Sequence, residues 1–324
     1  MLSATRRHLL AAAGAAVLAA GLSAPALAQE GRLTVIATTG MIADAVAQIG
    51  GERTRVQALM GPGVDPHGYR QTRSDIAAMT SADAVFWHGL HLEAQLEDLF
   101  HELSTQQTVV ALAETLPPET LLGWEGYEGR HDPHVWMDPA RWTRVVAAAR
   151  DALVGLDPAG ADIFRANADA HLADIKALGG YSAQVLGSVP QDARVLVTAH
   201  DAFSYFGDAY GFEVLGIQGM STESEAGLAQ IEYLVGVLVD RGIGAIFVES
   251  SVSDRNVRAL IEGAQARGHE VVIGGELYSD AMGEPGSYEG TYIGMIDHNV
   301  TTITRALGGE APPGGMNGRL GQGG

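Results

Sequence analysis

The sequence has 324 residues, of which 46% are hydrophobic and 18% are charged, and its formal net charge is −19. This composition excludes a disordered chain, and the length gives room for two domains. The acidic balance argues against nucleic-acid binding, because neutralising phosphates requires clustered Lys and Arg. Cysteine is absent, so disulfides, thiolate metal ligands and lipid attachment at a cysteine are excluded as well.

The N-terminal residues have the pattern of a secretory signal peptide. Arg6 and Arg7 form a basic start, residues 9–22 are an apolar run, and residues 26–28 (Ala-Leu-Ala) offer a small-x-small cleavage site. We therefore predict that residues 1–28 are removed, with cleavage near Ala28, and that the mature chain is periplasmic and free. The arginine pair also matches the core of a twin-arginine export signal.

After the signal, short β-rich runs alternate with helical patterns. In chain order, strands are predicted at residues 33–37, 55–60, 84–87 and 108–112, with helices at 41–49, 74–81 and 92–103. The pattern restarts with strands at 194–198, 213–216, 245–248 and 270–273, and helices at 203–210, 225–241, 254–267 and 291–307. Such alternation is typical of mostly parallel sheets with helices on their faces.

The segment between the two sets is Ala-rich and nearly free of strand signals. Residues 139–156 and 159–189 read as helices, with Pro158 placed to open the second one and Gly179 and Gly180 as the expected point of any bend. The predicted fold class is therefore α/β, with two β/α sandwich lobes joined by a long rigid backbone helix. The predicted bounds are 29–157 for the N-terminal lobe, 158–189 for the linker helix, 190–308 for the C-terminal lobe and 309–324 for a Gly- and Pro-rich disordered tail.

Two of the eleven histidines, His67 and His200, are singled out because they follow predicted strands, where open α/β sheets form their sites. His67 lies in a Gly- and Pro-rich loop that presents it rather than packs it. His134 lies between two Asp-Pro pairs, and either Asp132 or Asp138 is placed to orient its ring. Asp138 is also read as the N-cap of the next helix. His200 follows its strand directly.

Several neighbouring residues compete for a role. Asp201 is read first as the N-cap of the helix at 203–210. Asp280 and Glu276 both follow the last strand, and position alone does not separate them. Glu249 ends the strand at 245–248 and is read as support for a ligand. The remaining histidines considered are read as structural or solvated: His88, His91, His101, His171, His269 and His298.

Three imidazoles with one carboxylate form a donor set that suits zinc, iron and manganese. With Asp280 as the fourth donor, the separations along the chain are 67, 66 and 80 residues. This spacing predicts two ligands from each lobe. A closed four-ligand site between lobes favours capture and release over catalysis, which needs an open position for water.

Four motifs in order resemble the metal-binding solute-binding proteins of ABC transporters, cluster A-I, also called TroA-like. They are Gly-Val-Asp-Pro-His (63–67), Asp-Pro-His-Val-Trp-Met-Asp-Pro (132–139), Val-Thr-Ala-His-Asp-Ala-Phe (197–203) and Gly-Gly-Glu-Leu-Tyr-Ser-Asp (274–280). The resemblance spans residues 33–307. It implies a monomer with a metal ion buried between two lobes, which docks onto a membrane permease. It also implies the ligands His67, His134, His200 and Asp280, so it selects Asp280 over Glu276.

The resemblance also bears on the metal. Manganese-selective members commonly carry glutamate at the third ligand position, where this chain has His200, as in members associated with zinc or with both metals. Dedicated zinc members often carry a His-rich loop, and residues 117–130 contain no histidine run. We therefore expect Zn²⁺ or Mn²⁺ as cargo. A metal-dependent hydrolase is disfavoured because all four positions are occupied, and a surface adhesion protein because the lipidation cysteine is missing.

Overall fold

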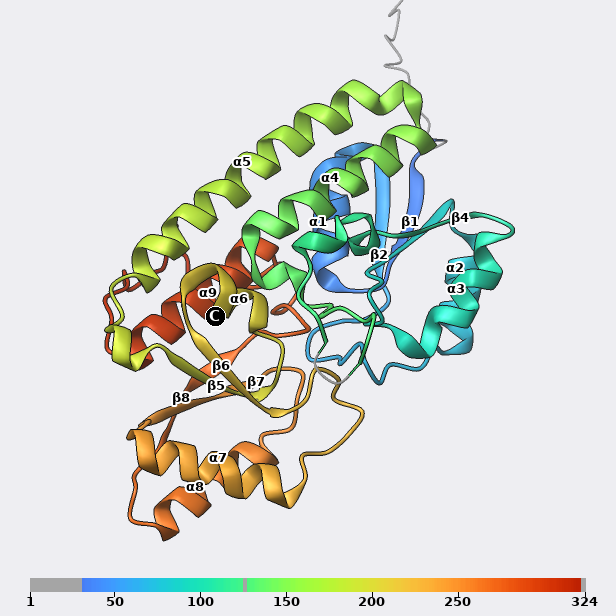
Figure 1. The fold of residues 1–324 in the computed structure, drawn as a ribbon. Helices are drawn as coiled ribbons and strands as arrows, with labels where there is room; N and C mark the ends of the chain where they lie inside the picture. Colours follow the sequence, from blue (N-terminus) through green and yellow to red (C-terminus); the bar gives the residue numbers. More distant parts are fainter. Residues whose placement is uncertain (1–30, 125–126, 322–324) are drawn as a thin grey trace, which may run out of the picture. The chain divides into compact units, whose positions relative to one another are not determined.

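The computed structural model of the chain describes residues 31–124 and 127–321. Figure 1 shows these residues as a ribbon coloured along the sequence. The predicted signal peptide, residues 1–28, lies outside the described part. No helix among the described residues combines the length and the apolar character needed to cross a membrane.

The first β/α region is a four-stranded parallel sheet in the order β2-β1-β3-β4. Alternate residues of its central strand face opposite sides: Val35 packs in the core that includes Met41, and Ile36 in the core that includes Phe100. Helices therefore cover both faces of the sheet (Figure 1). The elements are β1 (Leu33–Ala37), α1 (Gly40–Gly50), β2 (Thr54–Ala58), α2 (Arg73–Ser81), β3 (Ala84–Trp87), α3 (Glu97–Ser104) and β4 (Thr108–Ala111).

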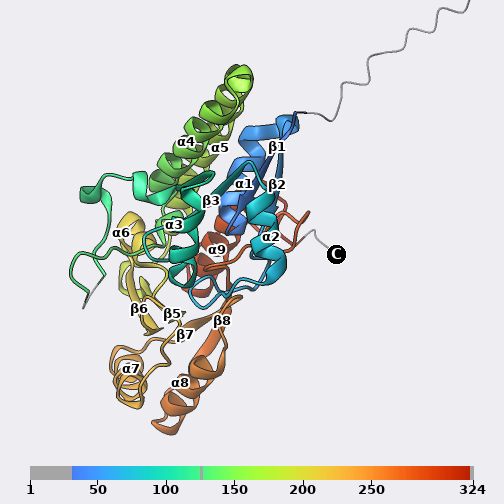
Figure 2. The same ribbon diagram turned by 90° about the vertical axis from the view of Figure 1, so that its right-hand side faces the viewer.

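The second β/α region contains two parallel strand pairs, β5 with β6 and β7 with β8, and β5 lies beside β7. Val197 of β5 packs with Leu234 and Leu260 on one side, whereas Leu196 joins the core on the other. Figure 2 shows α7 and α8 together on one side of these strands. The elements are β5 (Val195–His200), α6 (Ser204–Tyr210), β6 (Glu213–Gln218), α7 (Leu228–Arg241), β7 (Ala245–Glu249), α8 (Arg255–Ala266), β8 (Val272–Leu277) and α9 (Tyr292–Ala306).

Two long helices connect these regions. α4 (Pro139–Leu156) is capped by Asp138, whose carboxylate accepts the Ala140 N–H, as predicted. α5 (Ala161–Leu186) is one continuous helix of 26 residues, so Gly179 and Gly180 do not interrupt it. α5 packs against α1 and α4 of the first region and against α9 of the second (Figure 1). The predicted fold class, parallel α/β regions with a connecting backbone helix, is confirmed.

The tail differs from its prediction. Residues 309–321, expected to be disordered, form turns that are held by hydrogen bonds. The backbone N–H of Met316 donates to both carboxylate oxygens of Asp297 on α9, at 2.9 and 2.8 Å. Asp297 is fully buried, and a buried carboxylate needs such donors. Gly- and Pro-rich composition predicts turns, but it does not reveal that a buried acid binds them.

The helix predicted over residues 92–103 also differs, because α3 starts only at Glu97, after a short 3-10 turn at Ala94–Leu96. The buried carboxylate of Glu93 accepts the backbone N–H groups of His88 (2.8 Å) and Gly89 (3.1 Å). The chain therefore turns around this side chain. Burial raises the pKa of Glu93 to about 7 although these donors oppose the rise.

Candidate metal centre

Four residues from four separate segments meet at one point. His67 lies in the loop after β2, and His134 directly precedes the 3-10 turn at Val135–Met137. His200 is the last residue of β5, and Asp280 lies in the loop after β8. His67, His200 and Asp280 thus lie at or after the carboxyl ends of strands in parallel sheets, where α/β folds form their sites. All four side chains are at most 2% exposed.

One ligand atom from each residue lies within 4.8 Å of all the others. Nε2 of His67 and Nε2 of His134 are 3.2 Å apart. Asp280 Oδ2 lies 3.1 Å from Nε2 of His200 and 3.8 Å from Nε2 of His67, and Oδ1 lies 3.4 Å from Nε2 of His134. A tetrahedral ion with bonds of about 2.0–2.1 Å would separate its ligand atoms by about 3.3 Å. The four residues thus have the spacing of a metal coordination shell.

His200 is held by Glu249 at the end of the neighbouring strand. The Glu249 carboxylate lies 2.5 Å from Nδ1 of His200 through Oε2, and Oε1 accepts the His200 backbone N–H at 2.9 Å. A proton on Nδ1 leaves the Nε2 lone pair for a metal. The predicted supporting position of Glu249 agrees with this geometry.

His134 is held in the same manner by Asp132. Oδ1 of Asp132 lies 2.8 Å from Nδ1 of the imidazole and 2.8 Å from the His134 backbone nitrogen. Of the two carboxylates considered from sequence, Asp132 therefore orients the ring, and Asp138 caps α4. The Tyr205 hydroxyl donates to the Asp132 carbonyl at 2.8 Å, so α6 fixes this loop from the other region.

The loop that carries Asp280 is fixed through its backbone. The side-chain amide of Asn299 on α9 accepts from the Tyr278 N–H at 2.9 Å and donates to the Tyr278 carbonyl at 2.7 Å. The Trp136 indole N–H donates to the Ser279 carbonyl at 2.8 Å. Asp280 is thereby placed in the cluster, whereas its competitor Glu276 is exposed.

Both oxygens of Asp280 and Nε2 of His200 are buried without a hydrogen-bond partner. Such orphaned acceptors are costly unless a cation binds them. The chemistry of the donor set therefore fits a borderline divalent ion.

The pKa values of the three imidazoles are shifted in opposite directions: that of His67 is lowered, and those of His134 and His200 are raised. Burial lowers the pKa of His67 to about 3, so this ring is neutral. Burial opposes charge on His134 too, but Asp132 and Asp280 outweigh it and raise its pKa to about 9. Burial likewise opposes charge on His200, yet Glu249 and Asp280 hold its pKa well above the usual value. Burial would raise the pKa of Asp280, but His200 and His134 hold it well below its usual range.

Comparison with models of known protein families identifies one family that matches most of this chain. The family model described as the periplasmic component A of a zinc-uptake complex matches residues 35–306. The chain belongs to this family. A family of uptake-complex components is one of transport proteins rather than enzymes, and neither the hydrolase nor the adhesin alternative gains support.

Individual relatives support the same family assignment. The chain is 45% identical over 306 residues to the manganese-binding lipoprotein MntA of Bacillus subtilis, covering 93% of this chain and 99% of that protein. It is 45% identical over 280 residues to the zinc-binding protein TroA of Treponema pallidum, covering 86% of this chain and 90% of that protein. The solved structure of that periplasmic zinc-binding protein matches with a TM-score of 0.84 over 86% of this chain and 99% of the solved one.

The other residues considered from sequence lie outside the cluster. His88 is buried against Trp136 and Trp142, and its Nε2 lies 2.6 Å from the Pro133 carbonyl oxygen, while His91 pairs with Glu97. His171, expected to be solvated, is buried. Asp201 does not cap α6, because its carboxylate accepts the Ser204 hydroxyl instead and no side chain caps that helix.

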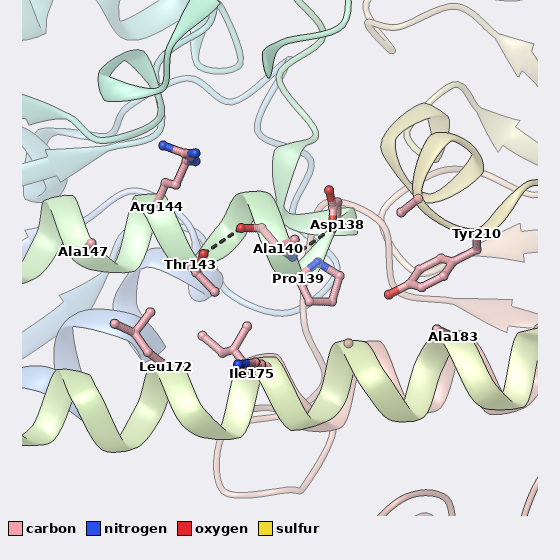
Figure 3. A pocket seen from close by; sticks show the side chains of 13 residues that line it. Asp138, Pro139, Ala140, Thr143, Arg144, Ala147, Leu172, Ile175, Ala183 and Tyr210 are labelled. Carbon is pink, nitrogen blue, oxygen red and sulfur yellow. Dashed lines mark hydrogen bonds between the residues drawn. The ribbon is translucent and has the colours of Figure 1, made fainter. Parts of the chain in front are cut away.

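A groove of about 830 Å³ between α4, α5 and α6 is separate from the centre, since none of the four residues lines it. Figure 3 shows its walls, which include Ala140 and Ala147 on α4, Leu172 and Ile175 on α5, and Tyr210 on α6. Asp280 instead lines a smaller cavity of about 270 Å³ beside Pro62 and Met282.

Proposed function

We propose that this chain captures one divalent transition-metal ion, Zn²⁺ or Mn²⁺, with His67, His134, His200 and Asp280, and delivers it to the membrane permease of an ABC importer. The observation that carries this proposal is the convergence of four buried ligand atoms within 4.8 Å. Their separations of 3.1–3.8 Å suit a single ion of this size.

The choice of metals follows from the donor set and the relatives. Imidazole suits zinc, and a carboxylate in the shell also accepts the harder manganese ion. One relative at 45% identity is named for manganese and another for zinc. Zinc binds more tightly than manganese at most nitrogen and oxygen sites. We therefore expect the order of affinity to be zinc over manganese, with metal supply deciding the physiological cargo.

Burial of the ligands indicates how the ion moves. With side chains at most 2% exposed, an ion reaches them only when the segments around the cluster separate. The two β/α regions are the natural moving parts. We propose the N-terminal lobe as residues 29–157, the linker helix as 158–189 and the C-terminal lobe as 190–308. The helix α5 limits the motion, because a helix packed against both regions bends less than a loop.

The compartment and partners are proposed on the same basis. The signal-peptide pattern and a family described as periplasmic support export, cleavage near Ala28 and a place in the periplasm. The manganese-binding relative is named a lipoprotein, whereas this chain has no cysteine to modify. We propose a free monomer that meets its permease by diffusion, and a twin-arginine export route on the strength of Arg6 and Arg7.

The proposal is tested by titrating the mature protein with Zn²⁺ and Mn²⁺ by calorimetry. Wild type should bind one ion, and His67→Ala combined with His200→Ala should abolish tight binding. A matched double variant, His91→Ala with His101→Ala, also removes two imidazoles but leaves the cluster intact, so it should bind as wild type. Unchanged tight binding in the first variant would show that the site assignment is wrong.

A further inference from the structure

One carboxylate joins the loop of His67 to the second β/α region. Oδ1 of Asp65 accepts the backbone N–H of His67 at 2.9 Å. Oδ2 of the same side chain accepts a very short hydrogen bond from the hydroxyl of Thr222, which lies 157 residues further along, between β6 and α7. Asp65 is thus bonded to a proposed ligand on one side and to the opposite region on the other.

His67 is held differently from the other two imidazoles. His134 and His200 are each fixed through Nδ1 of the ring by a buried acid within their own region. The described hydrogen bonds of His67 include no carboxylate at Nδ1, and its loop is held by the bond from its backbone nitrogen to Asp65. Of the three imidazoles, His67 is therefore the one whose position depends on the hydrogen bond between Asp65 and Thr222.

Other contacts bring the same two segments together. Gly63, four residues before His67, has a positive φ of 69°, and a β-carbon there would lie 3.3 Å from the Ser250 carbonyl oxygen. Glycine thus lets the loop approach the segment after β7 closely. Beside Thr222, Glu223 accepts a hydrogen bond of 2.6 Å from Gln95, but this pair is exposed and contributes little.

We propose that the Asp65–Thr222 hydrogen bond is a clasp that couples contact between the two regions to the placement of His67. When the regions are together, Thr222 holds Asp65, and Asp65 holds His67 against the ion. When the bond breaks, His67 is the first ligand freed. Asp65 and Thr222 are therefore positioning residues that set the rate of metal release, and this inference rests on the proposed function.

The experiment measures zinc release from the loaded mature protein to an excess of a chromogenic chelator by stopped flow. Thr222→Val removes the hydroxyl at constant shape, and Thr222→Ser keeps it. Hydrogen bonds to charged groups are among the stronger ones, so the valine variant should release zinc at least about tenfold faster, and the serine variant within about twofold of wild type. Thr143→Val is the matched control, because the described hydrogen bond of its hydroxyl is to the Ala140 carbonyl within α4, and it lines the groove that is separate from the metal centre.

Two further readouts separate a clasp from a general structural role. The visible spectrum of the cobalt-substituted protein should be the same in Thr222→Val and wild type, since the four ligands are untouched. In an Asp65→Ala background, which already releases zinc quickly, Thr222→Val should have no additional effect.

The outcomes distinguish the two proposals. If Thr222→Val binds one zinc ion and releases it at the wild-type rate, the clasp is wrong while the metal centre stands. If valine and serine variants are equally fast, the hydroxyl is not the cause and the clasp is again wrong. If wild type itself binds no stoichiometric zinc, the proposed function fails, and the clasp fails with it.

Discussion

Glu249 and His200 end two adjacent parallel strands, and their side chains meet with 2.5 Å between Oε2 and Nδ1. Neither side chain has any exposed surface. A buried imidazole beside a buried carboxylate is fixed in orientation and in tautomer, so Nε2 is aimed at the other ligands before an ion arrives.

Glu249→Gln should therefore weaken metal binding by about 10–100-fold without removing any ligand, because the amide no longer stabilises the oriented ring. Calorimetric titration with Zn²⁺ measures the change. Glu276→Gln is the control: Glu276 is the same residue type, lies in the nearby strand β8 and is exposed, so its variant should bind as wild type. Equal affinities for all three proteins would contradict the role given to Glu249.

Metal binding should release protons. At pH 7 the raised pKa values of His134, about 9, and of His200 leave both rings protonated in the metal-free protein, whereas His67, with a pKa of about 3, is neutral. An ion binds Nε2 only after that proton leaves, so about two protons should be released per ion. Calorimetry in buffers of different ionisation enthalpy counts them, and a count of zero would refute this charge distribution.

The same pKa values predict opposite pH trends for the two states. The folded-state pKa of His134, about 9, lies above the unfolded value near 6.5. Its charged form therefore stabilises the metal-free fold fully below about pH 6.5, and this contribution disappears as the pH rises through about 9. Metal affinity rises over the same window. The melting temperatures of loaded and metal-free protein should therefore diverge between pH 6.5 and 9, as thermal scans would show.

Removing the metal should destabilise the protein measurably. An ion at a free concentration 100 times its dissociation constant stabilises the folded state by about 2.7 kcal/mol. For a chain of this size, that corresponds to a melting temperature higher by about 4 °C. Adding a strong chelator should reverse the gain in wild type and leave the His67→Ala, His200→Ala variant unchanged. A chelator effect of the same size in both proteins would place the stabilising ion elsewhere.

Deleting residues 312–324 should lower stability without affecting metal stoichiometry. The deletion removes the Met316 N–H from the buried Asp297 carboxylate, which keeps the hydroxyls of Tyr288 and Thr301 as donors, and the loss of a hydrogen bond to a charged group costs about 1.5–3 kcal/mol. Urea unfolding of metal-free protein measures the loss. Arg319→Ala is the control: it removes only a cation placed over the Tyr288 ring, and we expect a smaller effect. A deletion as stable as wild type would mean that the tail contacts are dispensable.

Much of the candidate site could be predicted from local sequence. His67 and His200 follow predicted strands, His134 lies in a loop between two Asp-Pro pairs, and loop position, ligand chemistry and the family resemblance together select all three. Asp280 could be separated from Glu276 only through the family resemblance. The structure supplies the physical reason: residues 277–280 are turned inward by Asn299 and Trp136, which are distant in sequence.

What sequence could not predict depends on partners far along the chain. Asp65 and Thr222 are common residue types 157 positions apart, and no periodicity connects them. His171 lies on a predicted helix, but its burial depends on how α5 packs. The tail is predicted to be disordered because it is rich in Gly and Pro, whereas Asp297 and Arg305 on α9 bind its backbone.

The four proposed ligands lie between residue 67 and residue 280, so the site is incomplete until residue 280 has been synthesised. A chain that crosses the inner membrane unfolded arrives without bound metal and takes its first ion outside. A chain exported already folded, as the twin-arginine route requires, is complete while still in the cytoplasm and is exposed to the metal there. The export route thus decides which cellular pool supplies the first ion.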